Sequence, residues 1–302
     1  MSDGRWNFLQ MALADVVMFH WPDCFFDPRR NDESRRKLLK MRVVKRVFGT
    51  KFVWIAHNAT PHGATRRDPG SAAFVNQLDG IVHLCQAGWD IINTTYDVKP
   101  QTRQLITVHG RYDNAKPPLP CVAIADSSPV RLLGCGLLKP YKNFELAIDA
   151  MQRQLPEQAR LRILGKDCDR QYVDMLHNKV RALPAVTLEA PSTLLEEEDI
   201  LAAVDACDLF IIPYENILNS GAALLALSRN RPILAPDIGG LGELRDMVGS
   251  QWVYLYPGKL SPEILDDSLH WFRTTPRPKA PDLRGFAWDR VADDLDRFLD
   301  DL

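Results

Sequence analysis

The sequence has no CxxC pair, no strong excess of either charge and no apolar run near about 18 residues. Its six cysteines are scattered singly, several of them in apolar runs, which favours buried free thiols in a reducing compartment over disulfides or a metal site. A net charge of −2 argues against nucleic-acid binding over the whole surface. Because neither a secretory signal nor a membrane-spanning run is present, the sequence predicts a cytoplasmic protein.

The 302 residues are 46% hydrophobic and 25% charged, an ordinary composition for a globular protein. In the first half, short apolar runs that are typical of buried strands alternate with segments of helical spacing. The predicted strands are 14–22, 51–58, 79–85 and 103–110, and the predicted helices are 32–48 and 87–93. Strands that alternate with helices predict a parallel sheet with covered faces.

A second alternation follows a proline-rich segment, "NAKPPLPCVAIADSSPV", that is typical of a linker. It runs from "RLLGCGLL" through "ARLRILG", "AVTLEA" and "DLFIIP" to "RPILAP", and an amphipathic helix, "FAWDRVADDLDRFLDDL", ends the chain. We therefore predict an α/β fold with two Rossmann-like doubly wound domains, at 1–125 and 126–285, and a C-terminal helix at 286–302. In open parallel sheets ligands bind beyond the carboxyl ends of the strands, so the strand-end loops are the place to look.

The segment "YENILNSGAALLALS" lies between two of these strands and begins a helix with an unusually bare first turn. Ser220 is a good N-cap, and Gly221 and Ala222 leave the first amides open to approach. A helix N-terminus presents unpaired N–H groups and about half a positive charge, which suits a phosphate. The alternative is a serine-capped core helix, which is common.

The loop "GCGLLKPYKN" places Lys139 and Lys142 between another strand end and a helix. Lysines there can neutralise a pyrophosphate, although they could also be solvated loop charges. Both loops follow strands of one sheet and can share one edge. Together they favour a diphosphate ligand.

The order of "LLGCGLLKPYKNFELAIDAM", "LRILGK", "ACDLFIIPYENILNSGAALLALSRNRPILAPDIGGLGEL" and "FAWDRVADDL" resembles that of GT-B glycosyltransferases. The pattern is similar to glycosyltransferase family 4 and related bacterial exopolysaccharide glycosyltransferases. "HWPD", "WIAHNATPHG" and "VHGRYD" resemble the acceptor-side motifs of the same group. The resemblance implies transfer of a sugar from a nucleotide diphosphate sugar to a glycan or lipid-linked acceptor in bacterial polysaccharide synthesis, with no essential metal and no other cofactor.

The resemblance also implies roles for individual residues. His57 would face the donor sugar, and Glu215 matches the first acid of the family's Glu-x7-Glu motif, so these two are the catalytic candidates. His62 and His109 are second candidates on the acceptor side. The implied donor-binding residues are Gly136, Lys139, Lys142, Gly165, Lys166, Asn219, Ser220, Gly221 and Ala222. Chemically, an imidazole can accept or orient the proton of a sugar hydroxyl, while lysines and amides stabilise the departing diphosphate.

Three departures from the family pattern keep other functions open. Leu137 stands where the family usually has arginine, and Leu225 stands where the second acid of Glu-x7-Glu is expected. The chain begins after the family's opening strand and glycine loop, which predicts a shortened N-terminal domain. One alternative is a degenerate, non-catalytic GT-B protein that binds nucleotide sugar or a partner transferase. An epimerase of the same architecture is disfavoured, because no clear set of cleft carboxylates is present.

The segment 29–48 carries nine lysines and arginines against Asp32 and Glu33, with apolar residues at helical spacing. Such a helix can lie on an anionic membrane surface, here the inner face of the plasma membrane, where a polyprenyl-linked acceptor would be held. An ordinary domain helix with a solvated basic face is the alternative. Among the remaining histidines, His83 is interpreted as a core residue, and His20, His177 and His270 as surface or packing residues.

Overall fold

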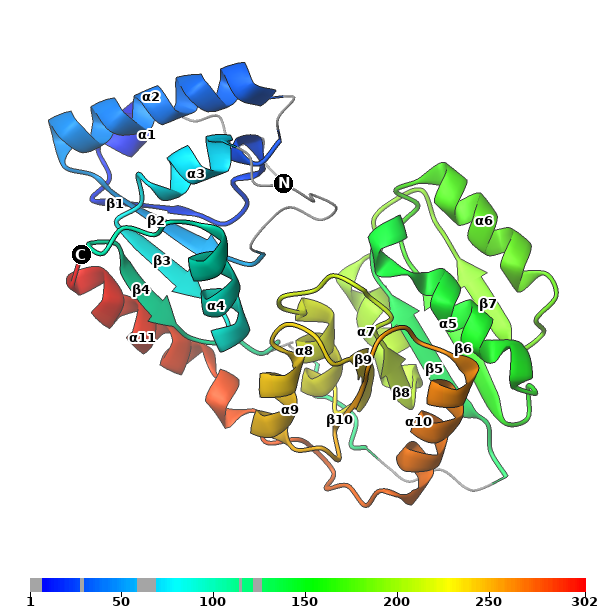
Figure 1. Ribbon diagram of the computed structural model, residues 1–302. Coiled ribbons are helices and arrows are strands. Elements are labelled where there is room, and N and C mark those ends of the chain that lie inside the picture. Colours follow the sequence, from blue (N-terminus) through cyan, green and yellow to red (C-terminus); the bar gives the residue numbers. More distant parts are fainter. Residues whose placement is uncertain (1–6, 28–29, 59–68, 114–115, 122–126) are drawn as a thin grey trace. The chain divides into compact units, whose positions relative to one another are not determined.

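The computed structural model describes residues 7–27, 30–58, 69–113, 116–121 and 127–302. The chain forms two compact units, the first from residues 1–108 and 288–302 and the second from residues 109–287. Among the described residues each unit holds one sheet, of four strands in the first and six in the second (Figure 1). All the strand pairs are parallel. The predicted fold class, α/β with two Rossmann-like domains, is confirmed.

The strands of the first unit lie in chain order across its sheet: β1 (Val16–Phe19), β2 (Lys51–Ala56), β3 (Gly80–His83) and β4 (Arg103–Ile106). Because each strand is added on the same side of the one before, right-handed crossovers place the connecting helices on a single face. The helical elements before β4 are α1 (Phe8–Ala12), η1 (Asp23–Phe25), α2 (Asn31–Phe48), α3 (Pro69–Val75) and α4 (Gln86–Thr95).

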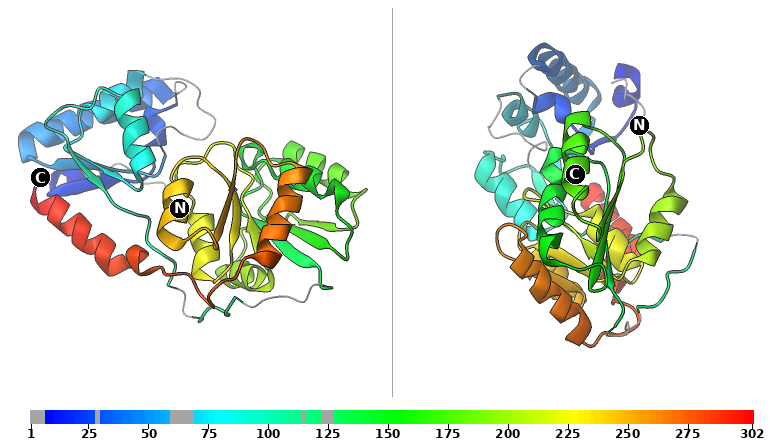
Figure 2. Two further views of the ribbon diagram at one scale, coloured as in Figure 1. Left: turned by 60° about the horizontal axis from the view of Figure 1, so that its bottom comes forward. Right: turned by 90° about the vertical axis from the view of Figure 1, so that its right-hand side faces the viewer.

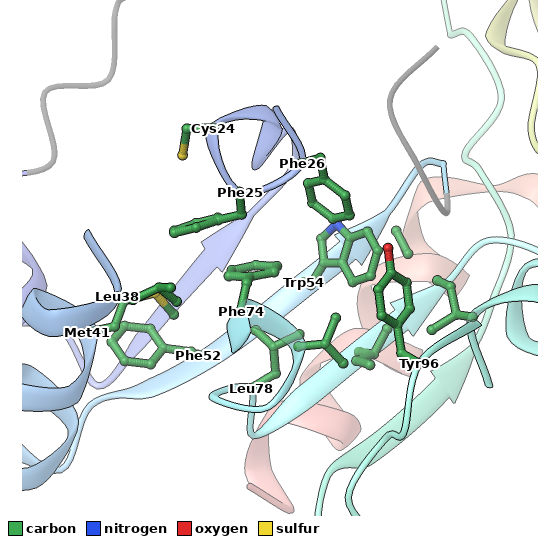
Figure 3. Packing of buried hydrophobic residues seen from close by; sticks show 14 of the residues in the cluster. Cys24, Phe25, Phe26, Leu38, Met41, Phe52, Trp54, Phe74, Leu78 and Tyr96 are labelled. Atoms are coloured by element: carbon green, nitrogen blue, oxygen red, sulfur yellow. The ribbon is translucent and has the colours of Figure 1, made fainter. Parts of the chain in front are cut away.

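The core beneath these helices is rich in aromatic side chains (Figure 3). The rings of Phe25 and Phe74 stack at 4.6 Å with an interplanar angle of 12°, and Trp54 meets Phe74 edge-on at 6.0 Å. From α2, Leu38, Met41 and Val44 are buried in the same cluster. Helix α2 therefore anchors itself with one apolar stripe, and its remaining apolar residues point elsewhere.

The opposite face of this sheet is covered by the last helix of the chain, α11 (Trp288–Asp300) (Figure 1). Phe298 packs with Val53, Ile55 and Val82 of β2 and β3. Gly80 makes this contact possible, since a Cβ there would lie 2.6 Å from the Phe298 ring. The crossover helices leave one face of the sheet uncovered, and the C-terminal helix covers that face.

The second unit has the strand order β10-β9-β8-β5-β6-β7. Its strands are β5 (Val130–Cys135), β6 (Ala159–Leu164), β7 (Val186–Glu189), β8 (Leu209–Ile211), β9 (Ile233–Pro236) and β10 (Val253–Tyr256). Its helices are α5 (Phe144–Ala150), α6 (Arg170–Val180), α7 (Glu197–Ala206), α8 (Gly221–Ser228), α9 (Leu241–Val248) and α10 (Pro262–Thr274), with short turns η3 (Pro140–Lys142), η4 (Met151–Arg153) and η5 (Arg284–Phe286). Helices α5, α6 and α10 lie on one face and α7, α8 and α9 on the other (Figures 1 and 2).

The structure divides the chain at 108/109 rather than at the predicted 125/126. The proline-rich segment belongs to the second unit, because buried side chains of that unit bind its backbone. Arg229 donates to the carbonyls of Lys116 and Pro117, and Asn230 donates to that of Leu119. The C-terminal segment predicted as a separate helix, 286–302, joins the first unit from residue 288 onward, through the contacts of Phe298.

Candidate functional site

The strand order of the second unit reverses between β5 and β8. From β5 the chain winds outward through β6 and β7, and from β8 it winds the other way through β9 and β10. The loops that follow these two adjacent strands therefore diverge to opposite faces at the carboxyl edge, which is the place where doubly wound sheets bind ligands. The predicted loops 134–143 and 214–220 are the two that meet there, as the sequence indicated.

Lys142 lies at this edge beside Gly136 and Tyr214, and we call these three residues the Lys142 cradle. Its Nζ is 3.9 Å from the centre of the Tyr214 ring, and among the described residues it has no carboxylate partner. Burial lowers the pKa of the Lys142 ammonium to about 8. The buried Tyr214 hydroxyl has no hydrogen-bond partner in the described part of the chain. A cation without a counter-charge beside an unsatisfied hydroxyl is an arrangement suited to an anion.

Two glycines shape the cradle. Gly136 has a φ of 138°, which side-chain-bearing residues rarely adopt, and a Cβ there would lie 3.7 Å from Lys142 Nζ and 3.9 Å from Tyr214 Oη. Gly165, at the end of β6, is contacted closely by the carbonyl oxygen of Gly136, which would be 1.7 Å from a Cβ. Gly165 therefore holds the first loop against β6, a structural role beside its predicted place near the nucleoside.

Helix α8 begins as the sequence predicts. Ser220 Oγ accepts a hydrogen bond of 3.1 Å from the Ala223 amide, so the cap is made. The amides of Gly221 and Ala222 have no partner among the described residues and lie at the positive end of the helix. Tyr112 Oη would lie 2.9 Å from a Cβ on Gly221, and His109 Nε2 would lie 3.9 Å from it.

The other predicted donor residues have plainer surroundings. Glu215 is exposed and forms an ion pair of 2.7 Å with Lys259. Lys139 and Lys166 are half-buried, and their carbonyls accept hydrogen bonds from Lys142 and Leu138. Asn219 is also half-buried, directly before the Ser220 cap. Their donor-binding roles stay predictions.

The acceptor-side histidines are placed in three different ways. His57 follows β2 in the first unit, and its Nε2 is 3.1 Å from Nδ1 of His20. His109 belongs to the second unit, where its Nδ1 donates to the Gly110 carbonyl at 2.7 Å and its ring lies beside that of Tyr112. His62 lies outside the described residues. Within the described residues, no three His, Cys, Asp or Glu side chains form a metal-binding group.

Two residues of interest, Tyr214 and His20, were not found from the sequence. Tyr214 was quoted only as the start of a loop, and its burial depends on Lys142 and Phe144, which come from 70 residues earlier in the chain. His20 was interpreted as a surface or packing residue. A signal was available in the sequence. The pair "HW" ends one predicted strand, His57 ends the next, and neighbouring parallel strands bring such ends together.

Comparisons with known proteins agree with this geometry. A family model described as Glycosyl transferases group 1 matches residues 129–266. A GDP-mannose:glycolipid 4-beta-D-mannosyltransferase from Xanthomonas campestris pv. campestris is 31% identical over 288 residues, covering 93% of this chain and 78% of that protein. The chain therefore belongs to the GT-B glycosyltransferases of group 1.

Solved structures share the fold at low sequence identity. Sucrose-phosphate synthase from Thermosynechococcus elongatus aligns with a TM-score of 0.67 at 15% identity, over 95% of this chain and 73% of that one. Anabaena HepE, in complex with UDP and glucose, aligns with a TM-score of 0.69 at 13% identity, over 98% and 80%. These likenesses support the two-unit GT-B architecture and nothing finer.

Proposed function

We propose that this chain transfers mannose, or a closely related hexose, from a nucleotide diphosphate sugar to a glycolipid acceptor in bacterial polysaccharide synthesis. The observation that carries the donor side is the Lys142 cradle, where a half-buried ammonium and the unsatisfied Tyr214 hydroxyl lie beside a loop at the switch point. The printed activity of the Xanthomonas relative supports GDP-mannose as donor and a glycolipid as acceptor.

The chemistry needs positive charge at the leaving group. As the bond from the anomeric carbon to the diphosphate oxygen breaks, negative charge grows on the diphosphate. Lys142 and the amides of Gly221 and Ala222 would stabilise that charge from fixed positions, and they can do so without a bound metal. We therefore propose a metal-independent transferase with no cofactor besides its donor substrate. Unchanged activity in excess chelator is the expected result, and loss of activity restored by one divalent ion would contradict it.

Calorimetric titration with GDP, UDP and ADP tests the donor site. We expect micromolar binding of one nucleotide, GDP first, and its loss in Ser220→Glu, because the new carboxylate would lie beside the diphosphate. Ser261→Glu is the matched control, since Ser261 caps α10 in the same way, with Oγ accepting from the Ile264 amide at 3.3 Å. Equal weakening in both variants, or no binding to the wild type, would contradict the proposed site.

A second candidate function is a non-catalytic GT-B protein that binds nucleotide sugar or a partner transferase. Leu137, Leu225 and the Glu215–Lys259 ion pair favour it, because each replaces or occupies a group that the resemblance assigns to the donor. Incubation with GDP-mannose and a polyprenyl-linked glycan separates the two functions. Mannosyl product in amounts above the enzyme concentration supports the transferase, whereas tight GDP binding without product supports the alternative.

We further propose that the protein works at the inner membrane surface through the exposed sides of α1 and α2. An outer stripe on α2, formed by Leu39, Val43 and Val47, is 62%, 40% and 66% exposed, and Leu13 beside α1 is 77% exposed. The ring of Phe8 contacts that of Phe48 edge-on, which joins the two helices. Exposed basic residues flank the stripe on both sides: Arg35, Arg36, Lys40, Arg42 and Arg46.

Apolar side chains between basic flanks fit an anionic lipid surface, where each Lys or Arg contributes about 1 kcal/mol. No helix of the described residues combines the length and apolar character needed to cross a bilayer. Cosedimentation with vesicles that contain anionic lipid tests the surface. We expect Val47→Glu to reduce binding and Leu194→Glu, 67% exposed in the second unit, to leave it unchanged. Equal binding of all three proteins would contradict the proposal.

A further inference from the structure

The carboxyl ends of β1 and β2 bring three ring side chains together in the first unit. The two strands are parallel neighbours with Phe19 opposite Trp54, so the residues that follow each strand emerge at the same edge. His20 and Trp21 follow β1 directly, and His57 follows β2 directly. The positions are fixed by strand pairing, and they do not depend on a long loop.

The contacts among these rings are close. His20 Nδ1 and His57 Nε2 are 3.1 Å apart, which is a hydrogen bond. The Trp21 ring stacks on His57, with centroids 4.7 Å apart and planes 13° apart. His20 is exposed and Trp21 is 58% exposed, whereas His57 is half-buried. The cluster thus has an inner imidazole, an outer imidazole and an exposed indole.

A hydrogen bond between two imidazoles requires one ring nitrogen to donate and the other to accept. When His20 Nδ1–H donates to His57 Nε2, the exposed Nε2 of His20 carries a lone pair. His57 then holds the outer ring in the correct orientation and tautomer, as the orienting group of a catalytic base does. One added proton on His20 leaves this hydrogen bond intact, so the pair can take up a single proton without rearrangement.

From this geometry we infer that His20 is the base that accepts the proton of the attacking acceptor hydroxyl, with His57 as its positioning residue and Trp21 as the stacking surface for the acceptor sugar. The inference rests on the proposed transferase function and assigns its acceptor side. The acceptor oxygen forms the new bond to the anomeric carbon, and its proton moves to His20 Nε2. The bond to the diphosphate breaks, and its electron pair leaves with the diphosphate.

Two general effects favour this arrangement. An imidazole can take up a proton at neutral pH, and a positioned base contributes about 10²–10⁴ in rate. The Trp21 indole lies beside the pair, stacked on the inner imidazole. The indole also offers an exposed apolar surface of the kind that sugar rings stack on. His57 keeps the importance that the resemblance implied, but acts through His20.

Steady-state kinetics with GDP-mannose and a polyprenyl-linked glycan test the three roles. We expect His20→Ala to lower kcat about 10²–10⁴-fold, with GDP affinity by calorimetry unchanged and with partial rescue by added imidazole. His57→Gln should lower kcat less than His20→Ala does, because its amide oxygen reaches the position of the His57 Nε2 atom and can still accept from His20. Trp21→Ala should raise the acceptor KM, and Trp21→Phe should have an acceptor KM close to that of the wild type. His270→Ala, an exposed histidine of α10, is the control and should match the wild type.

The outcomes separate this inference from the proposed function. Wild-type protein that neither binds GDP nor forms product contradicts the proposed function itself. An active wild type whose His20→Ala variant stays within about threefold, or loses GDP binding together with activity, overturns the role of His20 alone. An unchanged acceptor KM in Trp21→Ala overturns the stacking role.

Discussion

Replacing Lys142 with methionine should make the protein more stable while abolishing nucleotide binding. The ammonium sits beside the Tyr214 ring without a carboxylate partner among the described residues, and burial lowers its pKa from 10.5 to about 8. Each tenfold change in a protonation equilibrium corresponds to about 1.4 kcal/mol, so keeping this lysine charged costs the folded state up to about 3 kcal/mol. Residual solvent contact and the stacking on Tyr214 reduce the figure, and we expect a gain of about 1–3 kcal/mol in Lys142→Met at pH 7.

The pH dependence gives the sign of the effect. The folded state binds fewer protons than the unfolded state between about pH 8 and pH 10.5, so the free energy of unfolding rises with pH across that window. Below pH 8 the full cost is present, and above pH 10.5 the lysine is neutral in both states. The advantage of Lys142→Met should therefore be largest at pH 7 and shrink as the pH approaches 10.

Urea denaturation at pH 7 and pH 9.5 measures this difference, and Lys139→Met is the matched control. Lys139 belongs to the same loop, and its replacement should change stability by no more than about 0.5 kcal/mol at either pH. A Lys142→Met variant that is less stable than the wild type at pH 7 would refute the reasoning. So would a gain of the same size at both pH values, because it would come from packing and not from charge.

Three further substitutions probe the frame around the sites. Arg229→Met should lower the free energy of unfolding in urea by about 3–5 kcal/mol. The substitution leaves the buried Asp205 carboxylate, which Arg229 binds at 2.8 Å, without its partner, and it removes the hydrogen bonds to the 116–117 backbone. An unchanged free energy of unfolding would contradict this. Phe298→Ala should cost about 3–5 kcal/mol and increase amide exchange in β2 and β3, whereas exchange confined to α11 would show that the helix is not part of the core. Gly165→Ala forces the Gly136 carbonyl away and should weaken GDP binding at least tenfold, so unchanged affinity would separate this loop from the donor site.

The fold of the second unit was predictable because its physics is local and repetitive. Apolar runs such as 159–165 and 208–213 alternate with helical segments, and the right-handed crossover rule then places their ends on one edge. The Ser220 cap was predictable from residue type alone. Helix α10 was missed, although Ser261 and Pro262 are the cap and first-turn signals of a helix start.

The partial burial of Lys142 could not be predicted, because it depends on the ring of Tyr214 and on the φ of Gly136. The division of the chain failed for a similar reason. Prolines in 114–121 are typical of a linker, and nothing local reveals that Arg229 and Asn230 bind this backbone from a different element. The pairing of His20 with His57 also needed the strand order, since the two residues are 37 positions apart.

The cost of keeping Lys142 bears on the choice between functions. A half-buried ammonium without a counter-charge destabilises the folded chain, and a nearby anion turns that cost into binding energy. A chain that bound no nucleotide would therefore be better served by an apolar side chain at this position, so the cradle argues for a working donor site. It does not by itself separate an enzyme from a binding protein, because both need the diphosphate. That distinction depends on the first unit, where a base oriented by a second imidazole serves proton transfer and has no part in binding a nucleotide.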